Sequence, residues 1–112
     1  PRLAILTNAH GPALLAADAL RLNGGEPPLI RDLGGTAGPE EYRAAFAELA
    51  ASKDCHGILL IVTPQPATRV TETARALAAE AAKCHKTLLA SLMGGKLVGA
   101  GEALLSAAGV PT

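Results

Sequence analysis

The sequence has almost no aromatic side chains: its 112 residues include one tyrosine, one phenylalanine and no tryptophan. Its 10 lysines and arginines are balanced by 10 aspartates and glutamates, so the formal net charge is zero. Nucleic-acid binding relies on a basic surface that neutralises phosphates and often on aromatic rings on which bases stack. We therefore expect no nucleic-acid partner.

Long apolar runs and cysteines are also scarce. No run approaches the roughly 20 consecutive apolar residues of a membrane-spanning helix. The two cysteines are too few for a disulfide framework and fit a reducing compartment better. These absences predict a cytoplasmic protein without a membrane segment.

Small apolar residues dominate what is present. Hydrophobic residues make up 49% of the chain and charged residues 18%, and alanine and leucine are the commonest types, so a packed core is feasible. The length suits one domain, since domains typically run about 100–150 residues. The chain starts at Pro1 without a methionine and stops at Thr112, directly after an expected helix. We expect residues 1–112 to be a single domain, and a fragment of a larger multidomain protein.

Short apolar runs alternate with helical patterns along the chain. Continuous runs predict strands over residues 3–6, 57–62 and 87–91, and helical spacing predicts helices over residues 12–22, 39–49, 70–83 and 98–108. Alternation of this kind is typical of a parallel sheet covered by helices on both faces. The sequence therefore predicts an α/β fold, namely a three-layer flavodoxin-like or Rossmann-like domain.

The segment between the first two helices does not fit this scheme well. Residues 23–38 contain two glycine pairs and Pro27-Pro28, and only Leu29-Ile30 could form the second strand. Two explanations stay open: the second strand is short and lies at the edge of the sheet, or it is missing because residues are absent between Gly25 and Pro28.

Polar, glycine-bearing turns follow the strands, at the edge where open parallel sheets bind ligands. The first turn leads directly into a helix, whose free backbone N–H groups and dipole attract anions, although it contains no lysine or arginine. These features make the turn Thr7-Asn8-Ala9-His10-Gly11-Pro12 a candidate anion site, and Thr63, Gln65, Gly94 and Gly95 a possible strand-end site. We expect the turn at residues 32–36 to lie at the same edge of the sheet, next to these two sites. The alternative is that these are ordinary polar turns, which every α/β domain has.

No other motif in the sequence indicates a catalytic or metal-binding site. His10 stands at the start of the first helix, where it could hydrogen-bond a ligand or be an exposed turn residue without a role. Cys55-His56 and Cys84-His85 each precede a strand, but zinc ligands usually lie a few residues apart in one loop. We expect no metal site and assign no catalytic residue, and both thiols should lie at the edge opposite the ligand site.

Four turns in order make the sequence similar to a known family. Residues 3–18, 32–37, 61–65 and 90–95 resemble, in that order, a flavodoxin-like ligase-CoA domain of the NDP-forming acyl-CoA synthetases. This family contains the ADP-forming acetate–CoA ligases and the relatives of succinyl-CoA synthetase. The resemblance to the synthetases extends over nearly the whole chain. Bacterial protein acetyltransferases that contain a synthetase-like region also look similar in these residues.

The resemblance implies one domain of an acid–CoA ligase. In that family an acid, CoA and ATP give acyl-CoA, ADP and phosphate through a phosphohistidine on another domain, and none of His10, His56 or His85 lies in a matching motif. By the resemblance, residues 8–11 supply a helix N-terminus that holds this phosphohistidine. The parent enzyme would use ATP, Mg²⁺ and CoA, this domain alone would bind no cofactor, and its partners would be other domains or subunits of the synthetase.

Two departures and two alternatives accompany this interpretation. The family usually has glycine where His10 stands, and its members have a further strand and helical stretch between Gly25 and Pro28. The alternatives are a regulatory domain of a protein acetyltransferase and a stand-alone domain that binds a small anion. The isolated chain is not expected to be catalytic.

Overall fold

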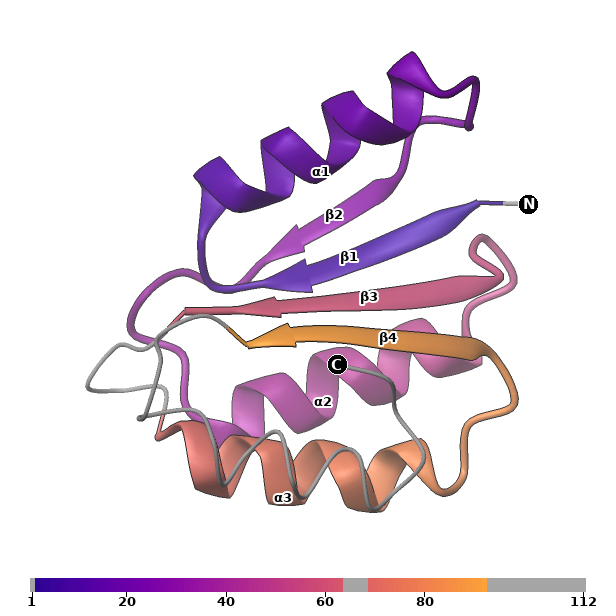
Figure 1. The fold of residues 1–112 in the computed structure, drawn as a ribbon. Helices are drawn as coiled ribbons and strands as arrows, with labels where there is room; N and C mark the ends of the chain where they lie inside the picture. The colour runs from indigo at the N-terminus through magenta and orange to yellow at the C-terminus, as the bar shows by residue number, and fades with distance from the viewer. Residues whose placement is uncertain (1, 64–68, 93–112) are drawn as a thin grey trace.

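The computed structural model describes residues 2–63 and 69–92. Strands and helices alternate through these residues, as the sequence predicted (Figure 1). The elements are β1 (Leu3–Thr7), α1 (His10–Leu22), β2 (Leu29–Asp32), α2 (Pro39–Ala51), β3 (Gly57–Val62), α3 (Val70–Ala81) and β4 (Thr87–Leu92). The helix expected over residues 98–108 lies outside the described residues.

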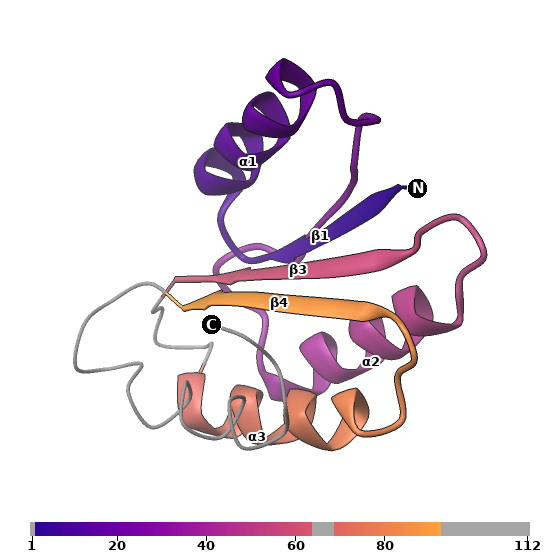
Figure 2. The ribbon, with the colours of Figure 1, turned by 45° about the vertical axis from the view of Figure 1, so that its right-hand side comes forward.

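The four strands form one parallel sheet in the order β2-β1-β3-β4. Helix α1 lies on one face of the sheet, and α2 and α3 lie side by side on the other (Figures 1 and 2). The result is the three-layer α/β arrangement of a flavodoxin-like fold, so the predicted fold class is confirmed. The chain leaves β1 and β3 toward opposite faces, which makes the β1–β3 boundary the topological switch point of the sheet.

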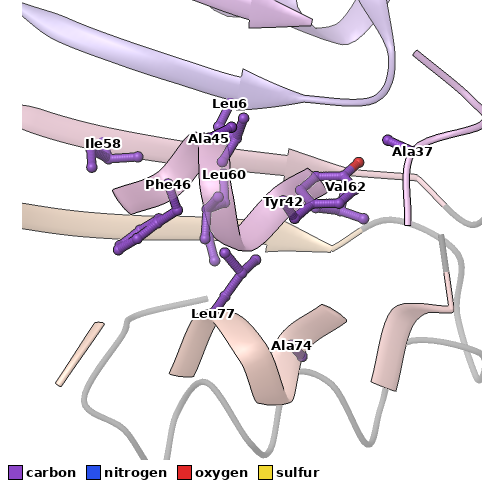
Figure 3. Packing of buried hydrophobic residues seen from close by; sticks show 11 residues of the cluster. Leu6, Ala37, Tyr42, Ala45, Phe46, Ile58, Leu60, Val62, Ala74 and Leu77 are labelled. Atoms are coloured by element: carbon purple, nitrogen blue, oxygen red, sulfur yellow. The ribbon is translucent and has the colours of Figure 1, made fainter. Parts of the chain in front are cut away.

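The larger part of the core lies between the sheet and the helices α2 and α3. Residues of β1, β3 and β4 point to this side, and Tyr42 and Phe46 from α2 fill the space beneath them with no exposed surface (Figure 3). Tyr42 and Phe46 are four residues apart, so both lie on one face of the helix that was predicted over residues 39–49. Full burial of a large apolar side chain contributes roughly 1.5–3 kcal/mol, so this layer supplies most of the hydrophobic stabilisation.

Helix α1 is attached much more lightly. Its only buried residue is Ala13, which packs with Ile5 and Ile61 on the facing surface of the sheet. Leu15 and Leu22 remain 73% and 83% exposed. The two faces of the sheet are therefore covered unequally by the described residues.

The second strand is short and lies at the sheet edge, as one of the two explanations predicted. The strand β2 has four residues and pairs with β1 alone, from Ala4–Leu29 to Thr7–Asp32. The glycine pair before it ends α1: the N–H of Gly25 donates to the carbonyl of Leu20, and the N–H of Gly24 to that of Arg21. This is a Schellman motif, and Gly24 has the positive φ (81°) that it requires.

Helix α1 begins two residues earlier than the sequence predicted, at His10 and not at Pro12. The hydroxyl of Thr7 accepts a hydrogen bond from the N–H of Ala9 at 2.9 Å and folds the chain back immediately after β1. Ala9 then becomes the N-cap residue in an extended conformation. As a result His10 and Gly11 belong to the first turn of the helix.

Candidate functional site

A side chain bridges the two strands at the switch point. Asn8 follows β1 directly, and its side-chain Nδ2 donates to the carbonyl of Thr63 at 2.8 Å. Its Oδ1 accepts from the backbone N–H of Thr63 at 2.9 Å and from the hydroxyl of that residue at 3.1 Å. Asn8 is only 5% exposed. Two of the predicted site residues, Asn8 and Thr63, therefore lie in contact, and the position of the crevice is fixed by buried hydrogen bonds.

The first turn of α1 presents backbone donors beside this bridge. A helix leaves its first N–H groups without intrahelical acceptors. Here the N–H of Ala9 is used by Thr7, Pro12 has none, and the N–H of Ala13 donates to the carbonyl of Ala9. The donors that remain in the turn are the N–H groups of His10 and Gly11, which have no acceptor among the described residues.

The surroundings of Gly11 are empty. No atom lies within 4 Å of the position that a Cβ would occupy on this residue, and its backbone has no positive φ. Neither packing nor conformation within the described residues therefore requires glycine here. What the missing side chain does provide is close access to the backbone at the N-terminus of the helix.

The turn after β2 joins the site, as expected from the sequence. Asp32 is the last residue of β2, and its Oδ2 lies 3.6 Å from the Nδ1 of His10. Its Oδ1 accepts a hydrogen bond from the N–H of Gly34 at 2.9 Å. The sequence contains no carboxylate near His10, so only the fold shows that one faces the ring. An anion at this helix end would therefore meet the dipole of α1 and the imidazole of His10 together with the negative charge of Asp32, which faces that imidazole.

Tyr42 extends toward the same edge from below. It lies in the first turns of α2, its ring has no exposed surface, and its hydroxyl is buried without a hydrogen-bond partner. Burial raises the pKa of Tyr42 well above its ordinary value, and the charge of Asp32 raises it further. The helical pattern of residues 39–49 gave no reason to place the hydroxyl of Tyr42 at the ligand edge. A tyrosine early in a helix that follows a strand-end turn is a signal that could have suggested it.

The opposite edge of the sheet has a different character. Both cysteines lie there as free thiols, as predicted, and Lys86 donates to the Sγ of Cys55 at 3.3 Å and to the carbonyl of Leu49 at 2.7 Å. A cavity of about 280 Å³ also opens there, lined by Arg2, Leu3, His56, Gly57 and Thr87. In the part of the chain that the structure describes, no three His, Cys, Asp or Glu side chains are grouped as metal ligands.

Three of the predicted strand-end residues, Gln65, Gly94 and Gly95, lie outside the described residues. Fold and site together thus define a flavodoxin-like α/β domain whose switch point is bridged by Asn8 and Thr63. Beside this bridge lie two helix N–H donors without acceptors among the described residues.

Comparison with known proteins shows which proteins the chain is similar to. No family model matches the chain. Over 110 residues the chain is 32% identical to the β subunit of ADP-forming succinate–CoA ligase from Chloroflexus aggregans, a match that covers 92% of the chain and 28% of the relative. The corresponding subunit of Hydrogenovibrio crunogenus is 40% identical over 55 residues, which cover 49% of the chain and 14% of the relative. That of Chloroflexus aurantiacus is 34% identical over 74 residues, covering 66% and 19%.

These similarities identify the chain as a distant homologue of succinate–CoA ligase β subunits and support the CoA-ligase superfamily. The chain spans between 14% and 28% of the length of these relatives. None of the helices among the described residues combines the length and the apolar character needed to cross a bilayer.

Proposed function

We propose that the chain is the flavodoxin-like domain of an ADP-forming acyl-CoA synthetase and that the N-terminus of α1 helps to hold the phosphohistidine of another domain. The observation that carries this proposal is the pair of N–H groups on His10 and Gly11, which point out of a helix end at the switch point. The similarity to succinate–CoA ligase β subunits supports the class of reaction. The parent enzyme would convert an acid, CoA and ATP into acyl-CoA, ADP and phosphate.

The chemistry asked of this domain is electrostatic. A phosphoryl group on a histidine carries negative charge, and a helix N-terminus stabilises such a charge by roughly 0.3–2 kcal/mol through its dipole and free N–H groups. The imidazole of His10, 3.6 Å from the Asp32 carboxylate, can supply a further donor. Since no lysine or arginine lies in residues 8–11, the remaining positive charge would come from the partner domain.

ATP, Mg²⁺ and CoA are assigned to the parent enzyme and not to this domain. A Mg²⁺ site needs oxygen ligands gathered around one point. Asp32 is the carboxylate at the switch-point edge, and its two oxygens already face Gly34 and His10. Among the described residues we therefore find no set that fits such an ion. Free thiols and the reaction class support a cytoplasmic parent.

The partners of the domain would be other domains or subunits of the synthetase. Leu14, Leu15 and Leu22 on α1 are 45%, 73% and 83% exposed, and Leu89 on the same face of the sheet is 44% exposed. Large apolar side chains that stay exposed on a helix in this way are typical of a contact with another part of a protein. The match covers 28% of the Chloroflexus aggregans subunit, so a further domain of the parent would be the part that covers these leucines.

The test is substitution of Gly11 in the full-length parent. Because a Cβ at Gly11 meets no atom within 4 Å, Gly11→Val should leave the fold intact while blocking approach to the helix N-terminus. We expect a loss of labelled phosphate transferred from ATP to the enzyme. Ala19→Val, at an exposed position on the same helix, is the matched control and should behave as the wild type. Equal phosphoenzyme formation in both variants would sink the proposal.

A further inference from the structure

Within residues 2–63 and 69–92, the one buried side-chain polar group without a hydrogen-bond partner is the hydroxyl of Tyr42. The residue has no exposed surface, and among the described residues this hydroxyl is the one buried side-chain donor or acceptor that finds no hydrogen bond. Buried polar groups are normally paired, because leaving water without a replacement bond is costly. Phenylalanine would fill the same space without that cost, as Phe46 does one helical turn later. The hydroxyl therefore calls for an explanation outside the packing of the core.

The hydroxyl is directed at the ligand edge of the sheet. The helix α2 starts at Pro39, on the carboxyl side of the strands, and helical side chains lean toward the N-terminus of their helix. Figure 3 shows the ring passing Val62, the last residue of β3, with its oxygen lying toward Ala37. The charge of Asp32 is near enough to contribute to the raised pKa of Tyr42. Tyr42 thus approaches from the α2 side the edge that His10 and Gly11 reach from the α1 side.

The nearby groups do not satisfy this hydroxyl. The Oδ1 of Asp32 accepts from Gly34, and its Oδ2 faces His10. The phenol stays protonated and has no hydrogen-bond acceptor in the described part of the chain. It is therefore a donor that is already removed from water and oriented toward the ligand edge, as donors are in sites that stabilise negative charge.

We propose that the Tyr42 hydroxyl is an additional binding group of this site and donates a hydrogen bond to an oxygen of the phosphoryl group held at the N-terminus of α1. This inference rests on the proposed function and deepens it. The anion would lie across the switch point, with backbone N–H donors from α1 on one side and the phenol from α2 on the other. Two donors on opposite sides fix the orientation of a tetrahedral anion, which a single helix end does not.

Access to the hydroxyl requires a displacement of the turn that covers it. Ala37, which is buried against the same cluster, belongs to the turn that joins β2 to α2. That turn contains Gly34 and Gly35, and nothing lies within 4 Å of where a Cβ of Gly34 would be. For the anion to reach the hydroxyl, this glycine-bearing turn would have to move away from the core, in which Ala37 is buried.

The chain offers a direct probe, because Tyr42 is its single tyrosine and it has no tryptophan. The near-ultraviolet absorbance and the emission of the 112-residue chain report on this side chain alone. The chain is titrated with inorganic phosphate at constant ionic strength, and binding is followed in parallel by calorimetry. We expect a saturable shift of the tyrosine signal at the phosphate concentration that saturates the heat. We further expect Tyr42→Phe to bind phosphate roughly tenfold more weakly, as for loss of a hydrogen bond to a charged group.

The outcomes separate this inference from the proposed function. Tyr42→Phe should unfold at the same temperature as the wild type or higher, since it removes an unpaired buried group, so weaker binding cannot come from damage to the fold. Phosphate binding that leaves the tyrosine signal unchanged and is equal in both proteins overturns the role of Tyr42 only. Absence of phosphate binding by the wild-type chain also overturns the role of Tyr42. The phosphoenzyme assay on the Gly11 variant tests the proposed function independently of this result.

Discussion

The side chain of Asn8 pairs with the backbone of Thr63 as a neighbouring strand would, by donating to its carbonyl and accepting from its N–H. It thereby extends the ladder between β1 and β3 by one step past the end of β1. At a topological switch point the chains normally diverge and leave a crevice. Here a buried amide closes the base of that crevice and holds the start of α1 in place.

We predict that Asn8→Ala destabilises the chain by about 1–3 kcal/mol. The reason is that the backbone N–H and carbonyl of Thr63 would lose the Asn8 side chain as their hydrogen-bond partner in a partly buried place. Chemical denaturation measures this loss. Asn23→Ala is the control: the Nδ2 of Asn23 also donates to a carbonyl, that of Ala19, but in an exposed position, so its effect should be smaller. Equal losses for the two variants would show that the bridge contributes no special stability.

Asp32 should oppose the binding of an anion. We predict that Asp32→Asn raises the affinity for inorganic phosphate several-fold, since removing a like charge at about 4 Å is worth roughly 1 kcal/mol even in water. Asparagine can still accept the hydrogen bond of Gly34, so the turn should persist. The gain should shrink as salt is added. Asp18→Asn, farther along α1 and paired with Arg21, serves as the control and should change the affinity less.

Tyr42 should make the chain sensitive to alkali. Its pKa is raised in the native state, so above a pH of about 10 the unfolded chain releases the phenolic proton while the native chain keeps it. Stability should therefore fall as pH rises, by up to about 1.4 kcal/mol per pH unit from this group. Absorbance of the phenolate gives the measurement, and it should appear together with unfolding. Tyr42→Phe should show a shallower decline, and an identical decline would contradict the assignment.

Lys86 should stabilise the end of α2. Its ammonium donates to the carbonyls of Leu49 and Ser52 and to the Sγ of Cys55, so it satisfies groups that a helix C-terminus leaves unpaired. We predict that Lys86→Met costs about 1–3 kcal/mol and increases hydrogen exchange in the last turn of α2. Lys83→Met removes the same charge at an exposed position and should be nearly neutral.

Local patterns were sufficient for most of the fold. The continuous apolar run at residues 57–62 is a buried strand, and Pro39 with the glutamates that follow it begins α2 as predicted. The start of α1 was missed because it depends on one hydroxyl, that of Thr7, folding back on Ala9. Propensity does not indicate which of several polar residues will cap a helix.

The site was predictable only in part. Parallel strands place their ends at one edge, so the meeting of the turns after β1, β2 and β3 followed from topology. The contacts between individual side chains did not follow: His10 and Asp32 are far apart in sequence, and so are Asn8 and Thr63. The hydroxyl of Tyr42 was hidden because a tyrosine on a core-facing helix stripe gives the same hydrophobic pattern as a phenylalanine.

The light attachment of α1 has a mechanical consequence. In the described part of the chain this helix packs on the sheet through Ala13, which is buried, and Ala16, which is partly buried, whereas α2 and α3 share a continuous core with the sheet. Layers with few buried contacts open at a lower free energy than the rest of a domain. We therefore expect α1, which carries the N–H groups of His10 and Gly11, to tilt or lift about the short turn after β1 more readily than α2 or α3, while the sheet beneath it keeps its register.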